Sequence, residues 1–161
     1  MTKAALLACL ALGLSSCAEK PPVTGVAPFY RQLDRQGAAV DANAAAEILS
    51  AYRRNHGLGP LAVDPALTAL AQASASSAAR ADKPASADAL KARLTAAGVK
   101  SPGINLSAGY RTLAEAFSGW RESPQHNRVL LQNPATRFGI ATAYAPGSKY
   151  KVYWALVVAG P

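Results

Sequence analysis

The side chains best suited to chemistry gather between positions 104 and 133, where Asn105, Ser123 and His126 occur in turn. A serine and a histidine can act as nucleophile and general base. Here their spacing of three places both on one short turn, and no oxyanion motif or orienting acid accompanies them. A single imidazole cannot hold zinc, which takes three or four protein ligands. We therefore expect no catalytic residues and no metal site; His126 either bonds to the backbone beside a cavity or contacts a ligand.

The second reactive group is Cys17, which ends the motif Leu14-Ser15-Ser16-Cys17. A basic start at Lys3 and an apolar run over positions 4–14 precede it, and this run is too short to span a bilayer. The pattern resembles a bacterial lipobox, in which the cysteine is lipidated and becomes the first mature residue. The alternative is a plain signal peptide with an incidental cysteine. Because Ala18 rather than an aspartate follows, the resemblance favours sorting to the outer membrane.

The length and the net charge of the chain limit the class of protein that it can be. Removal of the predicted signal peptide, residues 1–16, leaves 145 of the 161 residues, the length of one ordinary domain. The mature chain would hold no free thiol, because Cys9 leaves with the signal peptide and Cys17 carries lipid. Its net charge is 16 Lys+Arg minus 9 Asp+Glu, or +7. We expect the membrane and anionic envelope surfaces as partners, and no nucleic acid.

Helices are expected in the first two thirds of the chain. Residues 17–40 are expected to be a lipidated N-terminus and tether, because prolines and glycines break any periodic pattern, with Phe29-Tyr30 and Leu33 docked on a domain that spans 41–161. Helices are expected over about 42–56, 65–81 and 86–98, and from Thr112, which forms a capping box with Glu115. In this last helix Leu113, Phe117 and Trp120 should share one buried face.

The end of the chain has the pattern of two strands. Residues 138–144 and 150–158 are rich in residues that favour strands, and turn residues lie at 146–149. Two such runs around a short turn predict an antiparallel hairpin. Helices followed by a terminal hairpin indicate an α+β fold, with helices flanking a small antiparallel sheet.

Several segments then match, in order and spacing, the motifs of one family. They are YRRNHGLGPL at 52–61, the helix positions Asp64, Leu67, Ala71 and Ala75, NLSAG at 105–109, WRESPQH at 120–126, and the strand residues Gly139-Ile140-Ala141 and Tyr153-Trp154. Over about 43–158 the chain resembles the CAP superfamily (cysteine-rich secretory, antigen 5 and pathogenesis-related proteins) in its bacterial SCP-like branch. The resemblance implies an α-β-α sandwich.

The resemblance also implies an incomplete site. Members with a full site carry two histidines and two acids around a cavity, often with a divalent metal. His126 matches the second histidine, whereas Ile104 and Ser123 stand where acids would be and no histidine occurs near 80–86. We therefore expect no metal and no cofactor, and a cavity wall formed by His126 with Asn105 opposite and Ser123 nearby.

Two main classes of function stay open, and a purely structural role in the envelope also stays open. The favoured one is a lipid-anchored, non-enzymatic binding module of the bacterial cell envelope, at the outer membrane and facing the periplasm or the surface. Its ligand would be apolar or anionic, a small lipid-like or cell-wall molecule. The alternative is a degenerate hydrolase acting on cell-wall or peptide substrates. An acid such as Asp82 or Asp88 within hydrogen-bond reach of His126 would favour the hydrolase.

Overall fold

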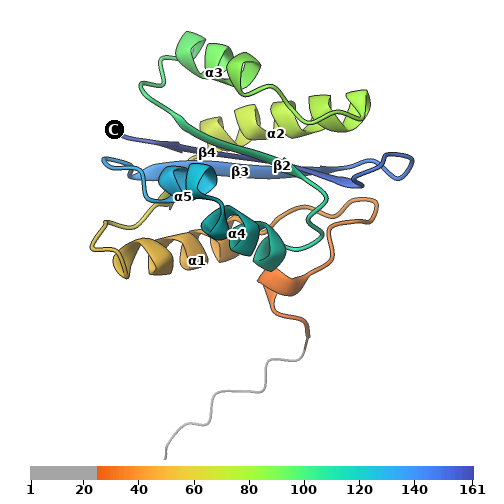
Figure 1. The fold of residues 1–161 in the computed structure, drawn as a ribbon, viewed down its shortest axis with the longest axis horizontal. Helices are drawn as coiled ribbons and strands as arrows, with labels where there is room; N and C mark the ends of the chain where they lie inside the picture. Colours follow the sequence, from red (N-terminus) through yellow and green to blue (C-terminus); the bar gives the residue numbers. More distant parts are fainter. Residues whose placement is uncertain (1–24) are drawn as a thin grey trace, which may run out of the picture.

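A four-stranded sheet forms the centre of the protein in this computed structural model, which describes residues 25–161 (Figure 1). The strands are β1 (Ala62–Val63), β2 (Gly103–Ala108), β3 (Arg137–Tyr144) and β4 (Val152–Ala159), in the spatial order β1-β3-β4-β2. β4 pairs antiparallel with both β2 and β3, whereas β1 pairs parallel with β3. Every residue of β4 is buried, which explains its nearly unbroken apolar sequence.

Helices cover both faces of this sheet. They are α1 (Ala42–Arg54), α2 (Pro65–Ala81), α3 (Ala87–Ala96), α4 (Leu113–Glu122) and α5 (Pro124–Leu130). The first four each follow a residue whose side chain accepts hydrogen bonds from first-turn amides, namely Asp41, Asp64, Ser86 and Thr112. Within residues 25–161, no helix has the length and apolar character needed to cross a membrane.

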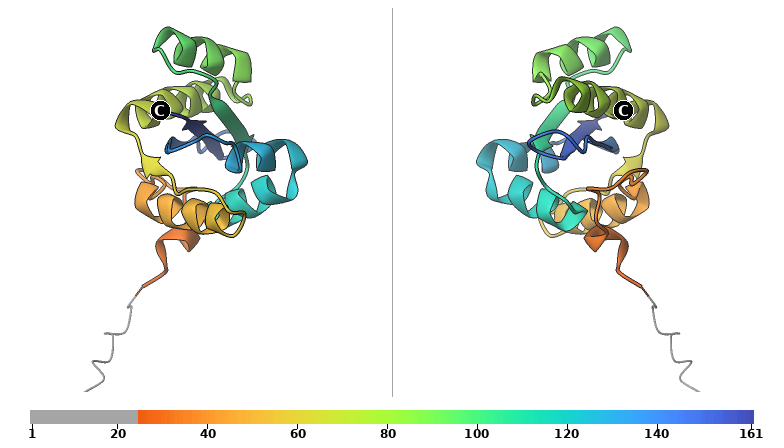
Figure 2. Two further views of the ribbon diagram at one scale, coloured as in Figure 1. Left: turned by 90° about the vertical axis from the view of Figure 1, so that its left-hand side faces the viewer. Right: turned by 90° about the vertical axis from the view of Figure 1, so that its right-hand side faces the viewer.

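The elements stack in three layers, with α2 and α3 on one face of the sheet and α1, α4 and α5 on the other (Figures 1 and 2). The predicted α+β class and α-β-α sandwich are therefore confirmed. The sheet departs from the expected antiparallel pattern only at its edge, because the two-residue β1 pairs parallel with β3.

The α2 face of the sheet is packed with small side chains. Ala71 and Ala75 of α2 are fully buried against this face. An added Cβ at Gly139 of β3 would lie 2.2 Å from the backbone of Leu67 and Thr68. Glycine at this position therefore lets the first turn of α2 approach the strand directly.

The opposite face is packed with large aromatic side chains. Leu113, Phe117 and Trp120 share one buried face of α4, as their spacing predicts. The ring of Trp120 meets that of Trp154 of β4 edge to face, with centroids 5.9 Å apart. This contact fixes α4 on the sheet and, through the short link at Ser123, also sets the position of α5.

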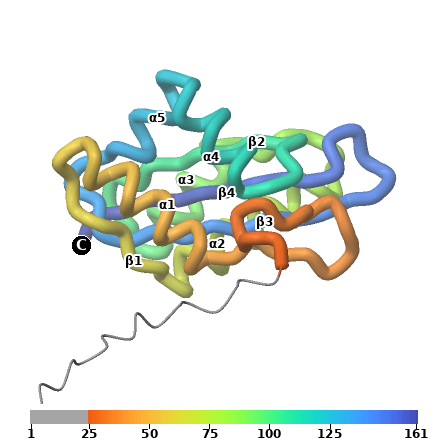
Figure 3. Tube along the Cα trace, turned by 90° about the horizontal axis from the view of Figure 1, so that it is seen from below, coloured from red at the N-terminus to blue at the C-terminus, as the bar shows by residue number. Residues whose placement is uncertain are grey.

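The described N-terminal segment is partly docked on the domain. A 3-10 helix, η1 (Pro28–Tyr30), packs against α1 and α4 and lies at the red start of the tube in Figure 3. Leu33 enters the core at 4% exposure and Phe29 packs against the same cluster, as expected, whereas Tyr30 points outward. The predicted signal peptide and the lipidation site Cys17 lie outside the described residues.

Three local features differ from the expectations. β1 and β2 form in segments for which no strand is expected, and α5 extends what is expected as a single turn. The capping box at α4 is shifted: Thr112 Oγ1 accepts from the Glu115 amide at 3.1 Å, but the Glu115 carboxylate accepts from the amide of Arg111, one residue before the expected partner. The acid still satisfies a free amide at the helix start.

Candidate functional site

Asn105 lies on β2, opposite Leu156 of β4. Its neighbours Ile104 and Leu106 pack into the α2 and α3 cluster. Because successive side chains of a strand point to opposite faces, Asn105 faces α4 and α5. Its side chain is fully buried, so each of its polar atoms needs a partner.

The side chain of Asn105 has only one of its ends paired. Nδ2 donates to the main-chain carbonyl of His126 at 3.0 Å, which ties β2 to α5. Oδ1 is buried and has no hydrogen-bond donor among the described residues. The structure thus brings Asn105 and His126 together through the backbone of His126, and leaves one buried acceptor open beside them.

The imidazole of His126 is half-buried on α5. Burial lowers the pKa of this ring, because the charged form loses hydration there. Within residues 25–161 no carboxylate forms a salt bridge with the ring. His126 is therefore a predominantly neutral imidazole at pH 7, able to donate one hydrogen bond and to accept another.

Ser123 joins α4 to α5. It is the N-cap of α5 by position, followed by Pro124, but its hydroxyl makes no capping hydrogen bond. In the described part of the chain it also makes no hydrogen bond to His126, three residues on in the same helix. The hydroxyl and the imidazole therefore do not form the contact that nucleophilic activation requires.

Two further contacts hold α5, and the sequence analysis missed both. Tyr52 Oη of α1 donates to Asn127 Oδ1 at 2.9 Å, and the Tyr52 ring meets Phe117 edge to face. Arg53, only 1% exposed, donates to the carbonyls of Gly59, Leu130, Gln132 and Ala135 at 2.8–3.1 Å. The pair Arg53-Arg54 gave no signal that one arginine points inward, since a surface pair has the same sequence.

The two acids whose closeness to His126 would favour a hydrolase do not lie beside that ring. The Asp82 carboxylate accepts a hydrogen bond from the buried hydroxyl of Tyr153 and another from the Lys149 amide. Tyr153 and Trp154 are neighbours on β4, so their side chains point to opposite faces of the sheet. Trp154 faces α4, so Tyr153 and its partner Asp82 lie on the α2 face, and the sheet lies between Asp82 and His126. Burial is the main cause that raises the pKa of Tyr153, and its bond to Asp82 adds to the shift. Asp88 has no contact with His126 in the described residues.

The side chains present do not fit a divalent metal. Within residues 25–161 no three His, Cys, Asp or Glu side chains lie close enough together to hold one. Ile104 faces the α2 cluster, and Ser123 offers a hydroxyl where a carboxylate would be needed. A single neutral imidazole leaves a metal ion nearly as hydrated as in bulk water.

A separate open cleft of about 280 Å³ lies between the end of α2 and the start of α3. Its floor is made of small and apolar residues: Ser74, Ser77, Ala78, Ala81, Pro84, Ala85, Ser86, Ala89 and Leu90. Lys83 and Arg93 supply two cations, and no carboxylate within residues 25–161 lines the cleft. Neither cation has an ion-pair partner in the described part of the chain. The sequence analysis singled out none of these residues.

Comparison with known proteins identifies the architecture. A profile of the cysteine-rich secretory protein family, CAP, matches residues 46–158. No sequence among the curated proteins matches the chain.

Three solved structures share the fold. A cysteine-rich secretory protein of Staphylococcus aureus aligns with 74% of this chain and 38% of its own, at 19% identity and a TM-score of 0.61. An outer surface protein of Borrelia burgdorferi aligns with 77% of this chain and 98% of its own, at 14% identity and a TM-score of 0.64. An extracellular SCP-domain protein of Bacillus anthracis aligns with 74% of this chain and 40% of its own, at 20% identity and a TM-score of 0.62. This chain thus spans about two fifths of the first and third proteins.

Proposed function

The chain belongs to the cysteine-rich secretory protein (CAP) family, and from that premise we propose that it is a lipid-anchored, non-enzymatic binding module of the bacterial cell envelope. Its ligand is a small envelope molecule with an anionic group and a short apolar part. The observation that carries the proposal is the α2–α3 cleft, with its floor of small side chains and two cations that form no ion pair within residues 25–161.

The cleft supports an anionic ligand for electrostatic reasons. Lys83 lies just before the N-terminus of α3, whose partial positive charge also favours an anion, and Arg93 lines the cleft from the last turn of the same helix. Ser77 and Ser86 add hydroxyl groups, although the Ser86 hydroxyl already accepts from the Ala89 amide. Small and apolar side chains between them leave room for a methylene chain or a peptide side chain.

Envelope anchoring is supported by the sequence before the domain. The motif that ends at Cys17 follows an apolar run of signal-peptide length. The similar structures include an outer surface protein and an extracellular protein, which agrees with export. A mature chain with an excess of seven positive charges, 16 minus 9, suits the anionic surfaces of an envelope.

The site around His126 supports binding more than hydrolysis. No acid of the described chain orients its neutral imidazole, and the amide of Asn105 is used to hold α5 on the sheet. We propose that His126, Asn105 and Ser123 form a hydrogen-bonding wall without a metal ion. The unpaired Oδ1 of Asn105 is fully buried, so the half-buried side chains of His126 and Ser123 are the parts of that wall that a ligand can reach.

The ligand assignment can be tested by native mass spectrometry of the purified protein. We expect a small anionic molecule to co-purify with the wild type, and to be lost from the double variant Lys83→Gln/Arg93→Gln. The matched control is Lys91→Gln/Lys100→Gln, which removes two exposed cations that do not line the cleft. Equal retention by both variants would exclude the cleft as the binding site.

The absence of a metal function can be tested by calorimetric titration with zinc. We expect no sub-micromolar binding to the wild type or to His126→Ala, because one imidazole cannot replace enough of the hydration shell. Stoichiometric tight binding that the substitution abolishes would mean that further ligands converge on His126. The hydrolase alternative would then have to be reopened.

The anchor can be tested at the proposed lipidation site. Cys17→Ser should leave the precursor uncleaved by lipoprotein signal peptidase, because the enzyme acts on the lipidated cysteine. The variant should also lose metabolic labelling with palmitate and partition differently between membrane and soluble fractions. Unchanged processing together with unchanged labelling would exclude lipidation at Cys17.

A further inference from the structure

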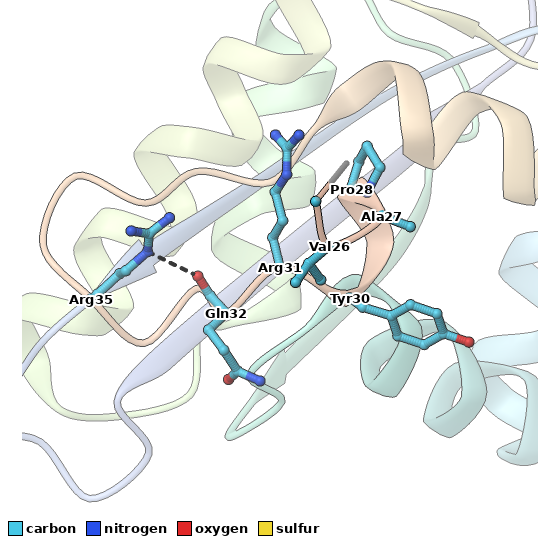
Figure 4. Close-up of a pocket in the computed structure, with 8 residues that line it drawn as sticks. Val26, Ala27, Pro28, Tyr30, Arg31, Gln32 and Arg35 are labelled. Atoms are coloured by element: carbon cyan, nitrogen blue, oxygen red, sulfur yellow. Dashed lines mark hydrogen bonds between the residues drawn. The ribbon is translucent and has the colours of Figure 1, made fainter. Parts of the chain in front are cut away.

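The described chain exposes two large hydrophobic side chains, and they lie together. Val26 is 62% exposed and Tyr30 is 56% exposed, whereas the other large apolar residues within 25–161 are buried or half-buried. Both line one shallow depression at the start of the described chain (Figure 4). Single exposed apolar side chains are ordinary, but two on one short segment form a patch.

This segment is held firmly from its other side. Leu33 is buried in the core and its amide donates to the Arg111 carbonyl at 2.8 Å. Phe29 packs against the same core, and the centroid of its ring lies 4.4 Å from the centroid of the Tyr30 ring. The Tyr30 amide closes η1 by donating to the Ala27 carbonyl at 2.9 Å. The segment therefore presents Val26 and Tyr30 to the outside in a fixed arrangement.

The patch carries positive charge. Arg31 and Arg35 are exposed and line the same depression, with Val26 between them and Tyr30 in Figure 4. Arg35 Nε donates to the Gln32 carbonyl at 3.4 Å, which leaves the outer end of its guanidinium open. Among the described residues no carboxylate lines the depression, and nearby Asp34 forms an ion pair with Arg111, with 3.5 Å between Oδ2 and Nε. Tyrosine beside arginine suits the boundary between lipid headgroups and water.

The position of the patch along the chain also points to a bilayer. Cys17, the proposed lipid-bearing residue, stands eight positions before Gly25. Eight residues reach at most ~26–29 Å when fully extended. An anchor at Cys17 would therefore keep this segment close to the membrane surface, where even weak contacts are formed repeatedly.

We infer that residues 25–35 are a membrane-contacting surface, in which Val26 and Tyr30 enter the headgroup region and Arg31 and Arg35 bind anionic lipid phosphates. The inference rests on the proposed lipid anchor and adds to it the orientation of the domain relative to the bilayer. The segment projects on the α1 and α4 side of the sheet, whereas α2 and α3 lie on the far side (Figures 1 and 2). Docking of this surface turns the α2–α3 cleft away from the bilayer, where it is open to an aqueous ligand.

The test uses the full chain, purified in its mature form and reconstituted into vesicles. Tyr30→Trp introduces a reporter indole, and the native Trp120 and Trp154 are at most 1% exposed, so lipid bromines do not reach them and their constant emission is subtracted with the wild type. The vesicles contain phosphatidylethanolamine with phosphatidylglycerol, or phosphatidylcholine alone, each with acyl chains brominated near the headgroup. We expect a blue-shifted indole that is quenched in the anionic vesicles.

The arginines are tested in the same reporter background. Each arginine near an anionic surface shifts the ratio of docked to undocked patch by roughly fivefold. Arg31→Gln/Arg35→Gln should therefore lower the quenching strongly. Arg80→Gln/Lys91→Gln, the matched control on α2 and α3 at the far side of the sheet, should leave it unchanged.

Each outcome separates the inference from the anchor. The intact mass reports the lipid on Cys17 independently of the fluorescence. An anchored chain whose indole is not quenched, or is quenched equally with phosphatidylcholine, overturns the inference and leaves the anchor intact. A blue shift without lipid quenching means that a second copy or another protein covers the patch, which also overturns it. A mature chain without lipid overturns both.

Discussion

The two faces of the sheet are packed by different means. On the α2 face, alanines and Gly139 let helix and strand backbones approach closely. On the α1, α4 and α5 face, two tryptophans fill the core, and polar groups such as Arg53 and Asn105 are buried among them. The first face should therefore be sensitive to added volume, and the second to lost volume or a lost hydrogen-bond partner.

The largest effect is expected for the buried arginine of the second face. Arg53→Met removes the donor for four carbonyls, and two of those bonds, to Leu130 and Ala135, are fully buried. An unpaired buried acceptor costs ~1–3 kcal/mol, so the free energy of unfolding should fall by ~2–6 kcal/mol. Urea denaturation measures this change in the free energy of unfolding. The control is Arg54→Met, an exposed neighbour that should change stability by less than ~0.5 kcal/mol.

Trp120 tests the loss of volume on the same face. Its side chain is fully buried and its Nε1 donates to Ser107 Oγ at 3.1 Å. Trp120→Ala should lower the free energy of unfolding by ~3–5 kcal/mol, because the cavity cannot close between α4 and β4. A melting temperature within error of the wild type would contradict the placement of this ring against Trp154.

Local patterns predicted most of the fold. Caps and spacing located α2 at 65–81, its observed bounds, and apolar spacing placed Leu113, Phe117 and Trp120 on one buried face. β2 was missed because GINLSA mixes glycine, asparagine and serine with only two large apolar residues. It becomes a strand because β4 pairs along its whole length, a contact between positions far apart in the sequence.

Gly139 tests the α2 face. Its Cβ would meet helix backbone rather than a flexible side chain, so Gly139→Ala must move α2 or β3. Overpacking of this kind costs ~1–3 kcal/mol of unfolding free energy. Gly147→Ala is the control, because an added Cβ there meets nothing within 4 Å. Equal stability of the two variants would show that α2 can retreat from the sheet without cost.

The candidate site was less predictable than the fold. The resemblance selected Asn105, Ser123 and His126, but the pairing of the Asn105 amide with the His126 carbonyl depends on how α5 docks on β2. Two features of that docking, the Tyr52–Asn127 hydrogen bond and the inward turn of Arg53, join residues far apart in the sequence. A pattern in a single chain carries no signal for such contacts.

The smallest expected effect is the pH dependence contributed by His126. Burial lowers the pKa of its imidazole in the folded protein, whereas the unfolded chain titrates near the ordinary histidine value of about 6.5. As the pH falls below that value, the unfolded chain takes up the proton first. The free energy of unfolding therefore falls with the pH until the folded pKa is passed, and is highest above about 6.5.

His126→Gln should remove this contribution while keeping a polar side chain of similar reach. We expect the wild type to lose more stability than the variant between about pH 7.5 and 5, measured by urea denaturation at each pH. His56→Gln, the same replacement at an exposed position just after α1, gives the matched background. A parallel pH profile for wild type and His126→Gln, or an NMR titration of His126 above the ordinary histidine pKa, would mean that an acid faces the ring. The second face would then hold an ionised pair in place of a neutral hydrogen-bonding wall.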